Sequence, residues 1–132
     1  MNEILQPEGW PRPKGYSNGV AATGRMVFTS GQIGWDEHEQ VVSDDLTAQV
    51  RKTLENTLTV LNEAGASPEH IVRMTWFITD KAAYVAGRQE IGKAYREVMG
   101  KCFPAMAVVF VEALLEDRAK VEIETTAVVP EA

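Results

Sequence analysis

The chain has 132 residues and a formal net charge of −6, with 45% hydrophobic and 24% charged residues. This length predicts one domain over residues 1–132, large enough to bury a core without metal or disulfide staples. The composition is typical of a soluble globular protein and excludes a disordered chain. The acidic charge disfavours nucleic acid as a partner, because affinity for phosphate comes from clustered Lys and Arg.

Cysteine content and apolar runs indicate the compartment. Cys102 is the one cysteine, so no internal disulfide can form, and a reducing cytoplasm is expected. Residues 1–7 lack the basic and apolar regions of a signal peptide. No apolar run reaches the length that spans a bilayer, so no membrane partner is expected.

The first forty residues are predicted to be mostly extended or irregular. Residues 1–15 contain three prolines and are predicted to form an irregular arm. Short strands are predicted at Val20–Ala22 and Met26–Ser30, with Thr23-Gly24 as the tight turn between them. Residues 31–40 are predicted to be a loop.

An amphipathic helix is predicted to begin after Ser43. Ser43 is a favourable N-cap, and Asp44 and Asp45 place negative charge near the positive end of the helix dipole. Gly65 is expected to follow the end of the helix. The apolar residues recur at helical spacing and form one face: Leu46, Val50, Leu54, Leu58 and Leu61.

A strand at Ile71–Thr79 and a second helix, capped by Asp80 and ended by Gly100, are predicted next. The inner face of that helix is expected to consist of Tyr84, Ile91, Tyr95 and Val98, with Gly87 at a close packing point. Alternate apolar residues of the strand are expected to form an exposed face that a second subunit covers: Met74, Trp76 and Ile78.

Two apolar strands, Ala107–Val111 and Lys120–Val128, end the chain and are predicted to pair as a hairpin. The order ββ, α, β, α, ββ predicts an α+β fold. In this fold both helices pack on one face of a mixed β-sheet.

Three short motifs make the pattern specific: Gly15-Tyr16-Ser17-Asn18-Gly19, Thr29-Ser30-Gly31-Gln32 and Cys102-Phe103-Pro104-Ala105-Met106. With the two C-terminal strands, they resemble the RidA family (YjgF/YER057c/UK114) from about residue 15 to residue 129. Active members of that family hydrolyse reactive enamines and imines. The resemblance implies a chorismate-mutase-like, RidA-type fold and a homotrimer with a small-molecule cleft at each subunit interface. It implies no cofactor.

The resemblance also implies a set of site residues. Tyr16 matches a tyrosine that lies over the ligand, and Ser30 and Gly31 match a Ser-Gly pair whose backbone approaches it. The backbone N–H of Ala107 is expected to face the ligand. Glu122 matches a glutamate that holds the attacking water, a role suited to imine hydrolysis. From the strand pattern alone, Glu122 and Glu124 indicate a solvated charged face.

Three other site positions depart from the family pattern. Gly92 replaces a frequent asparagine, Val108 replaces a frequent cysteine, and Met106 replaces the arginine that grips the substrate carboxylate. Losing such a charge-assisted pair costs roughly 2–5 kcal/mol. Because Met106, Val108 and Phe110 share a strand face, an apolar wall is expected there. The ligand is then less anionic, or its anion is met elsewhere. Arg88, one turn before Gly92, could reach in or simply face solvent.

Other chemistry finds little support. His38 and His70 have no His or Cys neighbour at ligand spacing, so no metal site is predicted. Cys102 has no evident histidine partner for nucleophilic catalysis. Trp35, in the loop after Gly31, either touches ligand or packs locally.

The sequence therefore favours a small-molecule-binding protein with an intersubunit pocket. It would act on imine, enamine or neutral carbonyl metabolites without the carboxylate-binding arginine. One alternative is a true enamine or imine deaminase with altered substrate preference. Others are an endoribonuclease or translation inhibitor, and a non-catalytic chaperone-like or regulatory binder.

Overall fold

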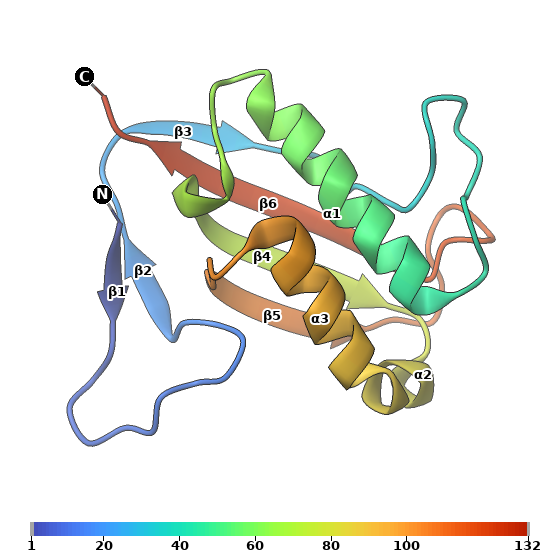
Figure 1. The fold of residues 1–132 in the computed structure, drawn as a ribbon, viewed down its shortest axis with the longest axis horizontal. Coiled ribbons are helices and arrows are strands. Elements are labelled where there is room, and N and C mark those ends of the chain that lie inside the picture. The colour runs from blue at the N-terminus through green and yellow to red at the C-terminus, as the bar shows by residue number, and fades with distance from the viewer. Residues whose placement is uncertain (1, 132) are drawn as a thin grey trace.

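The computed structural model describes residues 2–131 and has an α+β fold, as the sequence predicts (Figure 1). One sheet pairs two short strands, and a second sheet has the strand order β3-β6-β4-β5. The strands are β1 (Glu3–Leu5), β2 (Gly19–Ala21), β3 (Arg25–Phe28), β4 (Ile71–Ile78), β5 (Ala105–Phe110) and β6 (Val121–Val129). The helices are α1 (Leu46–Asn62), η1 (Pro68–His70), α2 (Lys81–Ala86) and α3 (Arg88–Met99).

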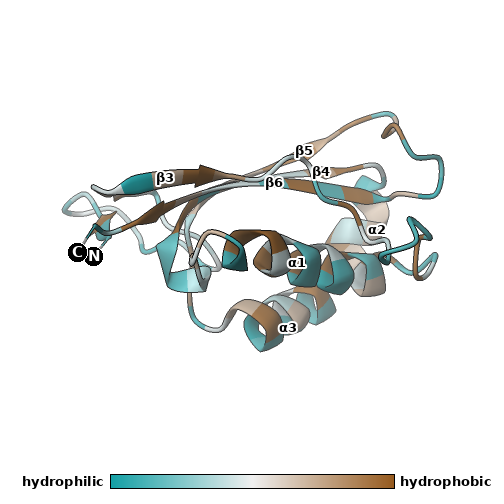
Figure 2. Ribbon diagram, turned by 90° about the horizontal axis from the view of Figure 1, so that it is seen from above, coloured by the Kyte–Doolittle hydropathy of each residue, from teal (hydrophilic) through white to brown (hydrophobic). Residues whose placement is uncertain are grey.

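Both long helices cover the same face of the four-stranded sheet, and the opposite face is bare (Figure 2). Strand pairing places Trp76 beside Ile123 and Val108 on the helix-covered face. Alternation along the strand turns Phe77 to the bare face, beside Glu122 and Val109.

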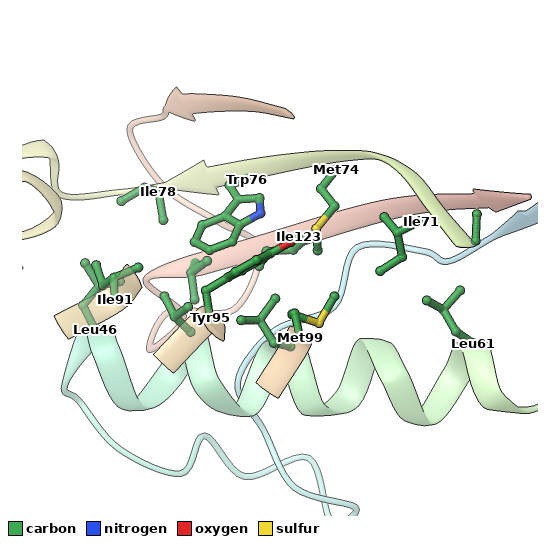
Figure 3. Packing of buried hydrophobic residues seen from close by; sticks show 14 of the residues in the cluster. Leu46, Leu61, Ile71, Met74, Trp76, Ile78, Ile91, Tyr95, Met99 and Ile123 are labelled. Atoms are coloured by element: carbon green, nitrogen blue, oxygen red, sulfur yellow. The ribbon is translucent and has the colours of Figure 1, made fainter. Parts of the chain in front are cut away.

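The expectation that Met74, Trp76 and Ile78 face a second subunit is wrong. All three side chains lie under the helices and are at most 3% exposed. They belong to a single core cluster in which Trp76 packs on Tyr95 (Figure 3). An apolar stripe on a strand predicts burial but does not say whether a helix or another subunit covers it.

The predicted C-terminal hairpin is also wrong. β6 is antiparallel to both β3 and β4, whereas β5 is parallel to β4 at the sheet edge, so β4 lies between β5 and β6. A hairpin prediction rests on closeness in sequence, but residues 111–120 are long enough to carry the chain past the end of β4. The parallel β4–β5 pair needs a crossover, which α2 and α3 supply.

The N-terminal segments differ from expectation in their partners. The arm is not irregular throughout, because β1 lies within it and pairs with β2. β3 pairs with β6 instead of β2. Gly24 lies between β2 and β3 with φ of 150°, and a Cβ there would lie 2.2 Å from the carbonyl oxygen of Val129. The turn therefore requires glycine.

Helix ends follow the predicted chemistry with two corrections. The α1 cap is Asp45, whose carboxylate accepts from the N–H of Ala48, while Ser43 accepts from the N–H of Asp45. The second predicted helix is divided at Gly87 into α2 and α3. Asp80 caps α2 as predicted. Within residues 2–131, no helix is long and apolar enough to cross a membrane.

A buried glutamine joins α1 to the segment that enters β6. The Gln49 amide donates to the carbonyl oxygens of Ser43 and Arg118 at 2.8 and 3.0 Å. Its carbonyl oxygen accepts from the N–H of Lys120 at 2.8 Å. Because Gln49 is fully buried, these backbone groups have no water to replace it.

Gln49→Leu is therefore expected to lower the free energy of unfolding by about 2–3 kcal/mol, because buried donors and acceptors lose their partners. Urea denaturation measures the change. Gln89→Leu, at an exposed position of α3, is the matched control and should change stability by less than about 0.5 kcal/mol. Equal effects of the two substitutions would contradict the role of Gln49.

Candidate functional site

A cavity of about 490 Å³ lies between α3, α2 and the edge strand β5. Four of the predicted site residues line it, namely Tyr16, Gly92, Met106 and Val108. Met106 and Val108 reach it because they occupy the helix-covered face of β5, beside Met74 and Trp76.

Hydrogen bonds at Ser17 bring the N-terminal loop to this cavity. The N–H of Ser17 donates to the carbonyl oxygen of Pro104 at 3.0 Å, and its hydroxyl donates to that of Phe103. Ser17 also forms a bridge with Ala105 at the start of β5. Tyr16 is consequently held at the cavity mouth, where it is 43% exposed.

Aromatic side chains form a large part of the cavity wall. Tyr95 stacks on Phe103 at a centroid distance of 5.8 Å, and Tyr84 meets Phe110 edge-on at 5.7 Å. Burial raises the pKa of Tyr84 and of Tyr95, so both phenols are neutral near pH 7. The sequence assigned the two tyrosines to the core alone, but they belong to the core and to the wall at once.

The charged groups of the wall are cationic. Arg88 lines the cavity, and so do Lys14 and Arg96, which the sequence analysis missed. The sequence did hold a signal for Arg96, because residues 88, 92 and 96 recur every four positions and share one face of α3. Among residues 2–131, no Asp or Glu contributes to this wall.

A second group of predicted residues lies on the bare face of the sheet. Gln32 exchanges backbone hydrogen bonds with Ile123 at 2.8 and 2.9 Å, which brings residue 31 beside β6. A Cβ on Gly31 would lie 2.0 Å from a carboxylate oxygen of Glu122. Ser30 is exposed next to this contact, and its hydroxyl accepts from the Gln32 amide at 3.1 Å. The absence of a side chain at Gly31 therefore leaves room for the Glu122 carboxylate.

Within one chain, the residues that line the cavity do not meet the group formed by Ser30, Gly31 and Glu122. Glu122 and Met106 point to opposite faces of the sheet, and β4 separates their strands. Ala107, next to Met106, lies on the Glu122 face. Trp35 is not part of the cavity wall; it pairs with Val41 in a loop.

The remaining reactive groups have structural surroundings. Burial and the nearby Glu69 carboxylate raise the pKa of the Cys102 thiol, which disfavours the nucleophilic thiolate. In the Asp36 loop the carboxylate accepts from the N–H groups of His38 and Gln40, which lowers its pKa. Over residues 2–131 no cluster of His, Cys, Asp and Glu is arranged to hold a metal ion.

Comparison with known proteins supports the same fold and family. The family model for endoribonuclease L-PSP matches residues 11–129. A 2-iminobutanoate/2-iminopropanoate deaminase from Salmonella typhimurium is 35% identical over 129 residues, covering 97% of this chain and 98% of the relative.

Solved structures agree. A conserved Rid-family protein from Yersinia pestis, YyfB, superposes with a TM-score of 0.86 at 28% identity, covering 97% of this chain and 98% of its own. Escherichia coli TdcF with bound serine gives a TM-score of 0.69 at 32% identity, covering 96% and 98%.

The contact between residue 31 and Glu122 can be tested by stability. Gly31→Ala should lower the free energy of unfolding by about 1 kcal/mol, because the added methyl group forces Glu122 off its present rotamer. In a Glu122→Ala background the same substitution should cost almost nothing, since the obstructing carboxylate is gone. Urea denaturation of the four proteins in this cycle gives the coupling. Additive effects would refute the contact.

Proposed function

Because the chain belongs to the RidA/YjgF family, which the endoribonuclease L-PSP model describes, we propose that it binds a small molecule in a cleft between subunits. There it acts on imine, enamine or neutral carbonyl metabolites. The observation that carries this proposal is the aromatic cavity lined by Tyr16, Gly92, Met106 and Val108.

The cleft requires a second copy of the chain. The cavity and the Ser30–Gly31–Glu122 group lie on opposite faces of one sheet, so a ligand in the cavity meets Glu122 only if another protomer presents it. The bare face offers apolar surface for such contact, because Met26 and Phe28 are 59% and 65% exposed. A homotrimer would repeat this contact around a threefold axis and complete three equivalent clefts.

The chemistry proposed for the cleft is addition of water to a C=N bond. Glu122 accepts a proton as the water oxygen bonds to the imine carbon, and the nitrogen takes up a proton. Glu122 then gives its proton to the amine nitrogen, the new hydroxyl group releases a proton to solvent, and breakage of the C–N bond releases ammonia and leaves a carbonyl group. Gly31 supports this role, because its missing side chain leaves the Glu122 carboxylate beside open backbone.

A true imine deaminase with altered substrate preference is the second candidate, favoured by the name of the Salmonella relative. Met106 limits the substrates of either function, because its thioether cannot neutralise a carboxylate. The endoribonuclease in the family model's name fits less well, since a net charge of −6 opposes binding to phosphate.

Assembly is the first test of the cleft. We expect a trimer by native mass spectrometry and light scattering. Phe28→Asp should dissociate it, because a carboxylate would be buried at the contact. Leu115→Asp, at a 92% exposed loop position, is the matched control and should leave the trimer intact. A stable wild-type monomer would remove the composite site.

Turnover of 2-iminopropionate is the second test. Wild type should hydrolyse this small carboxylate imine barely above buffer, because residue 106 offers no cationic anchor. Met106→Arg should restore part of the activity, and Glu122→Ala should remove what remains. Loss of freshly generated imine is followed directly. Leu115→Arg adds the same charge outside the site and should restore nothing.

High wild-type turnover that depends on Glu122 would show that the arginine is dispensable. The true-deaminase alternative would then replace the preferred function.

A further inference from the structure

We infer that the cavity takes an anionic ligand with an aromatic body, and that Arg88 and Arg96 hold its carboxylate from helix α3. The ligand class is therefore an aryl-substituted 2-imino or 2-oxo acid. This inference rests on the proposed function for the reacting group, while the anion and the aromatic body are argued from the cavity alone.

The charge of the cavity wall is opposite in sign to the net charge of the protein. The chain carries a net charge of −6, yet the charged groups of the wall are Lys14, Arg88 and Arg96. No carboxylate within the described part of the chain shares that wall. Cations gathered in a concave, partly apolar site raise the local concentration of anions. The charge pattern thus selects an anionic ligand in spite of the acidic surface.

Within the described residues, the guanidinium groups of Arg88 and Arg96 form no ion pair with a carboxylate. The ion pairs found in residues 2–131 involve His38, Arg51 and Arg118. Glu97, next to Arg96 in the sequence, is paired with Arg51 of α1, and this contact lowers the pKa of its carboxyl group. Arg88 and Arg96 are therefore available for a ligand.

Gly92 places the anion site between the two arginines. Residues 88, 92 and 96 lie on successive turns of one helix face, so Gly92 leaves a gap between the longer side chains. Nη1 of Arg96 lies 3.3 Å from the position that a Cβ on Gly92 would occupy, so this guanidinium rests over the glycine. A planar carboxylate that binds this guanidinium would lie outward of Gly92, on the helix face from which Arg88 also extends.

The rest of the wall selects the body of the ligand. Tyr84, Tyr95, Phe103 and Phe110 line the same cavity as Met106, and neither Tyr84 nor Tyr95 contributes negative charge near pH 7. A three-carbon acid would leave most of this surface wet in a cavity of about 490 Å³. An aromatic ring would instead be buried against flat side chains in stacked or edge-on geometry. Met106 supplies an adaptable apolar contact at the position where a shorter acid would need a cation.

Calorimetric titration of the intact protein can distinguish the contribution of the ligand's negative charge from that of its aromatic ring. The probes are 3-phenylpropanoate, its neutral analogue 3-phenylpropanamide, and propanoate, which lacks the ring. Wild type should bind 3-phenylpropanoate at least about tenfold more tightly than either of the other two. Arg88→Gln and Arg96→Gln should each weaken 3-phenylpropanoate binding about tenfold and leave 3-phenylpropanamide unchanged.

Lys93→Gln is the matched control, because it removes one charge from an exposed position of α3 outside the cavity wall. It should leave all three affinities unchanged. Absence of 3-phenylpropanoate binding, equal binding of acid and amide, or an equal loss in Lys93→Gln would overturn the inference.

Imine turnover tells the two proposals apart. Hydrolysis of imines without any preference for the phenyl acid would leave the proposed function standing and refute the anion site. Arginine-dependent binding of 3-phenylpropanoate without hydrolysis of any imine would establish the anion site and refute the proposed reaction.

Discussion

The pairing of β4 with β5 on one side and β6 on the other is the constraint on which the rest of the structure depends. Since β5 is parallel to β4, the chain must cross over between them, and α2 and α3 make that crossing. The crossing lays α3 over the β5 side of the sheet, where the aromatic cavity lies. The cavity is thus a consequence of strand direction.

The same sheet divides the candidate site between its two faces. Alternation along β5 sends Met106 and Val108 into the cavity, and alternation along β6 sends Glu122 to the bare face. Ser17 anchors Tyr16 to the first group, while Gln32 anchors Gly31 to the second. Each group is held by hydrogen bonds within the chain, so the proposed intersubunit cleft would need only the docking of a second copy.

Electrostatics and sterics combine on α3. Gly92 costs the helix some intrinsic propensity, but it leaves space in which the Arg96 guanidinium lies over the cavity. Arg51 draws Glu97 toward α1 and away from that space. The cavity wall thus has its arginines on α3, while β5 contributes the apolar Met106.

The sequence by itself determined the α+β class, the extent of α1, the Asp80 cap and the positions of β4, β5 and β6 to within two residues. These features depend on apolar periodicity and capping chemistry, which act over a few neighbouring residues. The family resemblance supplied Tyr16, Gly31, Met106 and Glu122 as site candidates, which periodicity alone could not single out.

Only the tertiary structure decided the strand order, the face on which each candidate lies and the cationic wall of the cavity. The predicted hairpin failed because β4 lies between β5 and β6, and sequence closeness carries no information about a third strand. Lys14 was missed because it is distant in sequence from Arg88 and Arg96 and joins their wall only where the loop anchored by Ser17 approaches the cavity. Local pattern predicts which residues are buried, whereas long-range hydrogen bonding and packing decide which of them meet.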